Sequence, residues 1–100
     1  MIIVTGTARF APGEIDRLHA QLAAFVDKVR RRDGCLSYSY ARDLNDPDIL
    51  HVIEQWRDEA AIDAHMTDLG DLMDALGGAK MEALSVKAYA AESRRTLMGE

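Results

Sequence analysis

The chain has 100 residues, a length that corresponds to one domain with a small core. Its 48% apolar content indicates a globular protein, and its net charge of −5 with a pI near 5.1 argues against nucleic-acid binding, which needs a basic face. One cysteine excludes an internal disulfide, and no apolar run approaches the roughly 18 residues of a membrane span, so we expect a cytoplasmic protein without a signal peptide.

The N-terminal third of the chain predicts a strand followed by a helix. Ile2 to Phe10 is rich in β-branched residues and ends at the turn-forming pair Pro12-Gly13. From Glu14 to about Arg32 the period changes to that of an amphipathic helix. The basic run Lys28 to Arg32 closes this helix, where positive charge complements the helix dipole. The apolar positions of the helix are Ile15, Leu18, Leu22, Phe25, Val26 and Val29.

The middle of the chain predicts a β-hairpin. Cys35 to Asp43 and Ile49 to Trp56 both alternate with a period of two, and Asn45 to Asp48 has the composition of a turn. Closure across this turn pairs residues of equal parity. The expected pairs are Tyr38 with Glu54, Tyr40 with Val52 and Leu36 with Trp56.

A second helix and a last strand follow the hairpin. Asp58 can cap the helix, Gly70 indicates a break or kink within it, and Gly77-Gly78 ends it. Glu82 to Ala91 predicts the last strand. The apolar positions of the second helix are Ile62, Met66, Leu69, Met73 and Leu76.

This element order, βαββαβ, predicts an α+β fold of the ferredoxin-like type, with a four-stranded antiparallel sheet and two helices on one face. We expect the domain to occupy residues 1–91, with a polar tail over residues 92–100. The first and third strands are apolar on both alternations, so both faces of the sheet should be covered. A second copy of the chain is the expected cover, giving a homodimer through the sheet faces.

Four short motifs resemble a known family: Gly34-Cys35-Leu36-x-Tyr38, Asp46-Pro47, Glu54-x-Trp56 and Ala61-Ile62-x-Ala64-His65. They are similar to motifs of the antibiotic biosynthesis monooxygenase domains, which are dimeric α/β-barrel proteins related to quinol monooxygenases and haem-degrading enzymes. The resemblance implies an oxygenase that acts on a phenol or hydroquinone with no cofactor. Haem-degrading relatives pair such a tryptophan with an asparagine on the first strand, and this strand has no asparagine.

His65 is the best candidate for a general base, because an unperturbed imidazole titrates near pH 6.5. It shares the apolar face of the second helix and should point inward. Together with Trp56 and Tyr38 it forms our predicted catalytic set. The alternative is a histidine at the edge of the core that only hydrogen-bonds a backbone carbonyl.

The even-numbered face of the hairpin carries the predicted pocket wall. We expect this aromatic face to look toward the helices, where a flat substrate would stack on Trp56 with Tyr38 or Arg42 near its oxygens. The same face could instead fill the dimer core. The predicted substrate-binding residues are Tyr40, Arg42, Glu54, His19 and Phe25.

Three functions therefore remain open. The leading one is a monooxygenase that converts a small phenolic or hydroquinone-type substrate with molecular oxygen and no cofactor. The second is a non-catalytic dimer that binds a small molecule or serves a stress response with the same cavity. The third, haem binding or degradation, is disfavoured by the missing asparagine. No metal is expected, because the three histidines lack ligand spacing.

Overall fold

The chain folds into four strands and three helices in the order β-α-β-β-α-α-β, which confirms the ferredoxin-like α+β fold. The computed structural model describes residues 1–100. None of its helices is both long and apolar enough to cross a membrane. The elements are β1 (Ile2–Phe10), α1 (Glu14–Arg30), β2 (Cys35–Arg42), β3 (Ile49–Trp56), α2 (Glu59–Met66), α3 (Leu69–Leu76) and β4 (Met81–Ala90).

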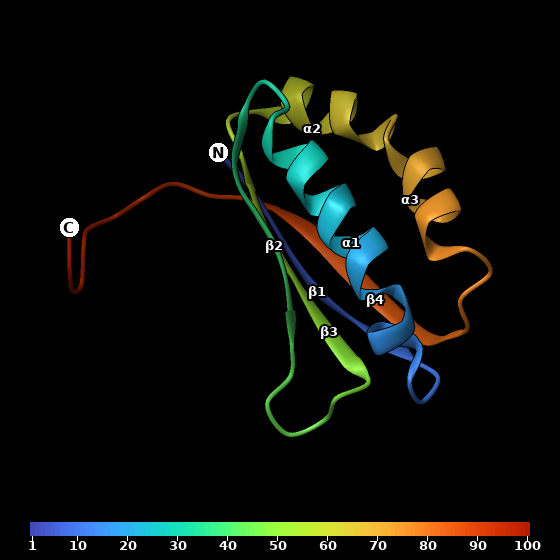
Figure 1. Ribbon diagram of the computed structural model, residues 1–100. Coiled ribbons are helices and arrows are strands. Elements are labelled where there is room, and N and C mark those ends of the chain that lie inside the picture. The colour runs from blue at the N-terminus through green and yellow to red at the C-terminus, as the bar shows by residue number, and fades with distance from the viewer.

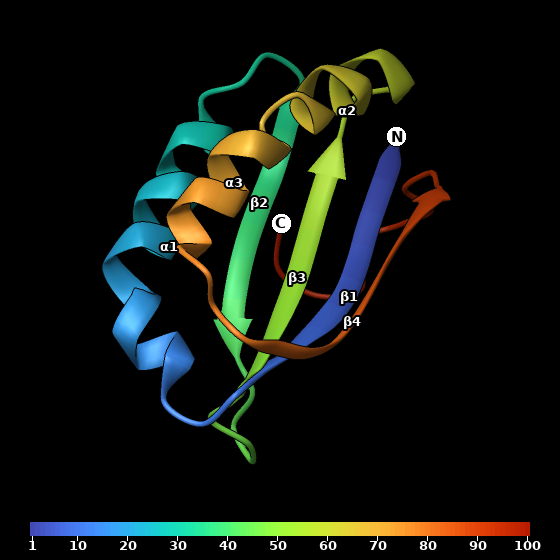
Figure 2. The same ribbon diagram turned by 90° about the vertical axis from the view of Figure 1, so that its right-hand side faces the viewer.

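The strands form one antiparallel sheet in the order β2-β3-β1-β4. All three helices lie on one face of it (Figure 1). They do not cover that face evenly. Figure 2 shows α1 and α3 on the β2 side of the sheet, while β4 lies at the opposite edge with no helix in front of it. Nearly the whole of β4 is consequently exposed, and residues 91–100 run away from the sheet on the side opposite the helices (Figure 1).

The core lies between α1 and the even-numbered face of the sheet. Alternate residues of β1 and β3 are buried, beginning with Ile2 in one strand and ending with Trp56 in the other. Period-two alternation sends these side chains to one face, and α1 supplies the opposing stripe. The aromatic face of the hairpin therefore looks toward the helices, as predicted. The buried residues of α1 are Ile15, Leu18, Leu22, Phe25, Val26 and Val29.

The hairpin register agrees with the prediction at two of its three pairs. Tyr38 lies opposite Glu54 and Tyr40 opposite Val52. The expected pairing of Leu36 with Trp56 is wrong, because Cys35 occupies that position and the register shifts by one residue before Ser37. Such a bulge places an extra residue in one strand, and Leu36 is 57% exposed as a result.

The second predicted helix is interrupted, but not at Gly70. α2 ends at Met66 and α3 begins at Leu69, so Gly70 lies inside α3. At the break, the amide of Asp68 donates to the carbonyl of His65 (2.7 Å), and the Thr67 hydroxyl donates to the carbonyl of Ala64 (2.6 Å). These bonds satisfy the last carbonyls of α2 in a tighter turn than an α-helix makes, and the chain changes direction.

Gly6→Ala should destabilise the protein by about 3 kcal/mol through overpacking. A Cβ atom at Gly6 would clash with the carbonyl oxygen of Ser85 and lie 2.6 Å from the Cα of Val86, both in the backbone of β4. Gly70→Ala is the matched control, because a Cβ there meets nothing within 4 Å and alanine favours a helix by up to about 1 kcal/mol. Urea unfolding of both variants measures the difference, and equal stabilities would contradict the close approach of β4.

Candidate active site

A cavity of about 430 Å³ lies between the helices α2 and α3 and the inner face of the sheet, and it extends to the exposed strand β4. This volume falls within the range of small-molecule sites, about 300–1,000 Å³. Its lining is mainly hydrophobic, with Met66 and Met73 on the helical side and Leu84 and Val86 on β4. The lining residues that carry polar atoms in their side chains are Tyr38, Tyr40, Glu54, His65 and Lys87. We call this space the active-site cavity.

His65 of α2 is buried and held by a carboxylate. Its Nδ1 lies 3.1 Å from Oδ2 of Asp68, three residues further along the chain. Arg32, two residues past the end of α1, binds both oxygens of Asp68, at 2.6 Å each. Hydrogen bonding to Arg32 lowers the pKa of Asp68 to about 2, so this group is a carboxylate and accepts only. The neutral imidazole therefore carries its hydrogen on Nδ1 and leaves Nε2 as the basic nitrogen.

A second buried carboxyl group lies on the Nε2 side of the ring. Oε1 of Glu54 is 3.8 Å from Nε2 of His65, beyond hydrogen-bond distance, and accepts a hydrogen bond from the indole of Trp56 at 2.9 Å. Burial raises the pKa of Glu54, while the hydrogen bond from Trp56 and the positive charge that His65 carries when it is protonated oppose that shift. An imidazolium at His65 would thus have a carboxyl group near each of its nitrogens.

Aromatic rings enclose the imidazole. The ring of Trp56 stacks on His65 with centroids 4.7 Å apart, and Tyr38 meets His65 edge-on at 5.2 Å. The hydroxyl groups of Tyr38 and Tyr40 are 2.7 Å apart. Burial raises the pKa of Tyr40 to about 12 and that of Tyr38 further, so both remain neutral phenols. One of the two hydroxyl hydrogens is free to donate to a ligand, since the pair needs only one.

The structure brings some of the predicted site residues together and separates others. His65, Tyr38, Tyr40 and Glu54 all line the active-site cavity. Trp56 does not line it, because its ring is wholly buried behind His65 and cannot also be the surface on which a substrate stacks.

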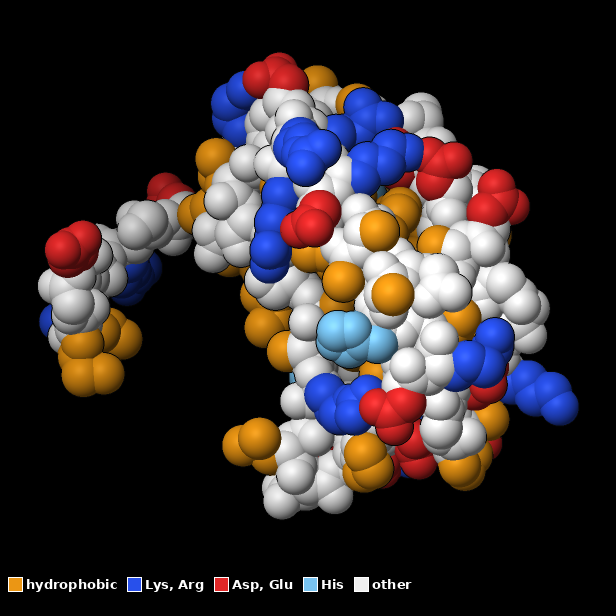
Figure 3. Space-filling view, viewed as in Figure 1, with side chains coloured by type: hydrophobic (Ala, Val, Ile, Leu, Met, Phe, Trp, Pro, Cys, Tyr) orange, Lys and Arg blue, Asp and Glu red, His pale blue; other side chains and the backbone are white.

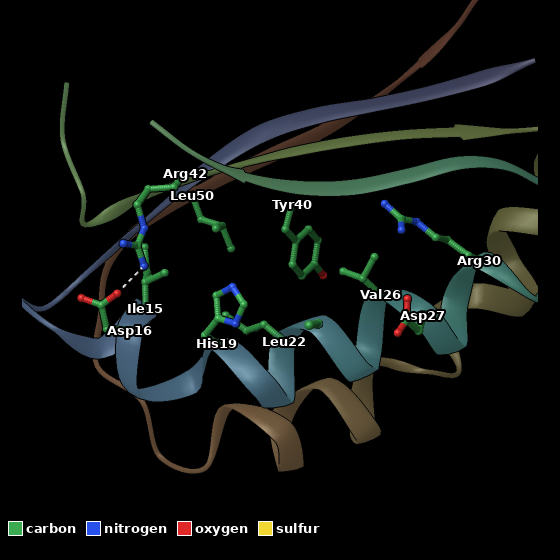
Figure 4. A pocket seen from close by; sticks show the side chains of 11 residues that line it. Ile15, Asp16, His19, Leu22, Val26, Asp27, Arg30, Tyr40, Arg42 and Leu50 are labelled. Atoms are coloured by element: carbon green, nitrogen blue, oxygen red, sulfur yellow. Dashed lines mark hydrogen bonds and ion pairs between the residues drawn. The ribbon is translucent and has the colours of Figure 1, made fainter. Parts of the chain in front are cut away.

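The other predicted residues lie outside the active-site cavity. Phe25 belongs to the core, with its ring 6.4 Å from that of His65. His19 and Arg42 line a different hollow, between α1 and β2 (Figure 4). No group of three or more His, Cys, Asp or Glu residues is arranged to hold a metal ion.

Sequence reasoning missed Asp68 and Arg32. The basic run that ends at Arg32 was interpreted only as a complement to the helix dipole, and Figure 3 shows Lys and Arg side chains gathered where α1 ends and α2 begins. One signal was present: Asp68 follows His65 by three residues, a spacing that places two side chains together on a helix. Nothing local to Arg32 indicated its partner, which lies 36 residues away.

Glu54→Gln should raise the free energy of unfolding at pH 7. Because burial raises the folded-state pKa of Glu54, the unfolded chain releases this proton at a lower pH, and the wild type loses stability as pH rises above the ordinary value near 4.5. Glutamine keeps an oxygen for the indole of Trp56 and carries no charge. Urea unfolding should show a larger gain at pH 7 than at pH 4, and a gain independent of pH would count against a buried carboxylate.

Comparison with known proteins places this geometry in a family. The family model described as "Antibiotic biosynthesis monooxygenase" matches residues 1–68, more than half of the chain. The chain belongs to this family. The matched region of this monooxygenase-family protein ends at Asp68 and so includes the residues around the His65 imidazole.

Solved structures agree with the assignment. The chain is similar to a protein from Deinococcus radiodurans, provisionally named an antibiotic biosynthesis monooxygenase, at 29% identity and a TM-score of 0.86, covering 99% of this chain and 100% of that one. It is also similar to PA3566 from Pseudomonas aeruginosa, at 29% identity and a TM-score of 0.77, covering 92% and 94%. The uncharacterized protein sll1783 of Synechocystis is 31% identical over 64 residues, which are 64% of this chain and 44% of that longer protein.

Proposed function

We propose that this protein is a monooxygenase that works without a cofactor on a small phenolic or hydroquinone-type substrate. The observation that carries the proposal is the buried imidazole of His65, which lines an apolar cavity and has the ionised carboxylate of Asp68 beside its Nδ1. A general base must lie next to the proton that it removes, in surroundings that exclude water. The burial of His65 beside the active-site cavity supports this role.

The first step is the loss of a phenolic proton to Nε2 of His65. The imidazolium that forms is stabilised by Asp68 on Nδ1 and by the nearby carboxyl group of Glu54. The phenolate that remains is a much better electron donor than the phenol, and a tyrosine hydroxyl can donate to its oxygen. The protein thus lets the substrate itself supply the electron that molecular oxygen requires.

The later steps balance without an external reductant. The phenolate passes one electron to O₂, and the resulting phenoxyl radical and superoxide join in a carbon–oxygen bond. His65 returns its proton to the peroxide, then removes the hydrogen of the attacked ring carbon while the oxygen–oxygen bond breaks. That proton joins the departing hydroxide as water. Hydroquinone and O₂ thereby give hydroxyquinone and water.

We also propose that the functional form is a homodimer. Its two copies would meet through their outer sheet faces, the faces opposite the helices. On this face Ile53 is 46% exposed and Tyr89 52% exposed, with Ile3 and Ile49 partly buried beside them. A second sheet against these residues would complete the covering that the helices provide on the inner face. Sedimentation equilibrium should give a dimer mass for the wild type and a lower mass for Ile53→Asp. A monomeric wild type would contradict this part.

The proposed activity is tested by oxygen uptake with 1,4-hydroquinone as the probe. The protein should accelerate uptake above the rate in buffer, and with ¹⁸O₂ one labelled atom should appear in each product molecule. Formation of hydrogen peroxide, with no ¹⁸O in the organic product, would indicate simple oxidation and contradict oxygenation. Binding of hydroquinone by calorimetry with no acceleration would assign the non-catalytic alternative instead.

A further inference from the structure

The second hollow of the molecule has its own chemistry. It has a volume of about 420 Å³ and lies between α1 and β2, and we call it the α1–β2 groove (Figure 4). Leu22, Leu50 and Tyr40 line both this groove and the active-site cavity, so these side chains form a shared wall. The groove therefore opens on the other side of Tyr40 from His65.

The centre of the groove offers two flat groups to a ligand. Figure 4 shows the ring of Tyr40 pointing from β2 toward the helix, and the imidazole of His19 pointing from α1 toward the sheet. His19 is exposed and makes no side-chain hydrogen bond within the chain. The base of the groove is apolar: Ile15, Leu22, Val26 and Leu50.

One end of the groove offers a guanidinium that can change partner. Nη2 of Arg42 lies 2.8 Å from Oδ1 of Asp16, whose side chain is 75% exposed. An ion pair of this kind contributes at most about 1 kcal/mol, because water solvates the exposed carboxylate of Asp16 well. A ligand carboxylate can bind a guanidinium through two parallel hydrogen bonds, a stronger arrangement than the single contact to Asp16.

The opposite end is fixed. Nε of Arg30 donates to the backbone carbonyl of Tyr38 at 2.8 Å, and its Nη2 donates to the hydroxyl of Ser39 at 3.4 Å. These bonds hold the second guanidinium along β2 rather than across the groove. Arg42 is therefore the guanidinium that can exchange its present partner, Asp16, for a ligand carboxylate. The apolar base and the two rings favour a flat hydrophobic ligand.

We propose that the α1–β2 groove is a second binding site, for an aromatic carboxylate whose ring lies between His19 and Tyr40 and whose carboxylate binds Arg42. This site goes beyond the proposed oxygenation and does not depend on turnover. An occupant would touch the ring whose hydroxyl is 2.7 Å from that of Tyr38, and Tyr38 in turn packs against His65. The groove thus has a direct structural connection to the active-site cavity.

The test is a titration of the whole protein with 2-naphthoate, followed by NMR. The side-chain resonances of His19 and Arg42 should shift with saturation, while the methyl groups of Met66 and Met73, which line the active-site cavity, should not. Arg42→Gln should weaken binding roughly tenfold or more, because it removes a charge-assisted hydrogen bond. Arg31→Gln, an exposed arginine outside the groove, is the matched control.

Two further measurements make the result decisive. His19→Ala should also weaken binding, and because His19 is exposed this variant is expected to fold. The neutral analogue 2-naphthamide should bind more weakly than 2-naphthoate to the wild type. Shifts confined to Met66 and Met73, equal affinities for the two probes, an unchanged affinity in Arg42→Gln, or no saturable shift would each overturn the proposal. None of these results depends on whether hydroquinone is oxidised.

Discussion

His65→Gln should slow the hydroquinone-dependent uptake of oxygen by roughly 10²–10⁴-fold, the usual contribution of a positioned general base. Glutamine is similar in size and can still accept a hydrogen bond, but it cannot take up a proton at neutral pH. The loss should appear in kcat, because the imidazole takes part in the proton-transfer step and not in binding the aromatic ring of the substrate. Oxygen uptake at saturating hydroquinone measures it directly.

His51→Gln is the matched control for this experiment. His51 also has a carboxylate on one ring nitrogen, with Nε2 2.8 Å from Oδ1 of Asp43, but it lies on the opposite face of the sheet. Its replacement should leave the rate of oxygen uptake within a few-fold of the wild-type rate. Equal losses in both variants would show a general effect of removing a paired histidine, and an unchanged rate in His65→Gln would refute the base.

Arg32→Gln should lower the free energy of unfolding by about 3 kcal/mol. Removing one partner of a buried ion pair leaves the other charge in an apolar setting without compensation, a loss of about 3–5 kcal/mol. The lower end applies here, because Arg32 itself is one-third exposed and Nζ of Lys28 remains 3.9 Å from Asp68. Urea unfolding at pH 7 measures the change.

The same variant should change the response to acid. In the wild type the folded-state pKa of Asp68 is about 2, below its ordinary value of 3.8, so its stabilisation of about 2 kcal/mol is present above pH 4 and is lost as pH falls toward 2. Without Arg32 the main cause of that low pKa is gone, and the burial of Asp68 acts to raise its pKa. The loss of stability on acidification attributable to Asp68 should therefore become smaller in the variant.

Arg17→Gln controls for the geometry of the pair. Arg17 also binds one carboxylate through two nitrogens, at 2.9 and 2.8 Å from the oxygens of Glu14, but half of its side chain is exposed. An exposed pair of this kind contributes at most about 1 kcal/mol. Similar losses in Arg32→Gln and Arg17→Gln would contradict the argument that burial of Asp68 determines the effect.

Local periodicity was enough to predict most of the fold. The limits of β1 and β3 agree with the alternating patterns over Ile2–Phe10 and Ile49–Trp56, because each of these strands has one buried face. The position of the break between α2 and α3 was not predictable from the helical pattern. At this break the carboxylate of Asp68 binds Arg32, two residues past the end of α1, and no short window of sequence contains both residues.

The candidate site was predictable in its membership more than in its arrangement. Parity alone placed Tyr38 and Glu54 on one face, and helical spacing turned His65 inward. The sequence did not indicate that the imidazole would cover Trp56, nor that Tyr40 would separate Arg42 and His19 from the other residues. Those relations depend on how the helices pack over the sheet.

The stacking of the sole tryptophan on His65 equips the molecule with a built-in optical reporter. A protonated imidazole withdraws excited-state electron density from an adjacent indole far more effectively than a neutral one does. Protonation of His65 should therefore lower the fluorescence intensity of Trp56. The protonation state of one ring can thus be followed by light in the unmodified protein, without labels, isotopes or catalysis.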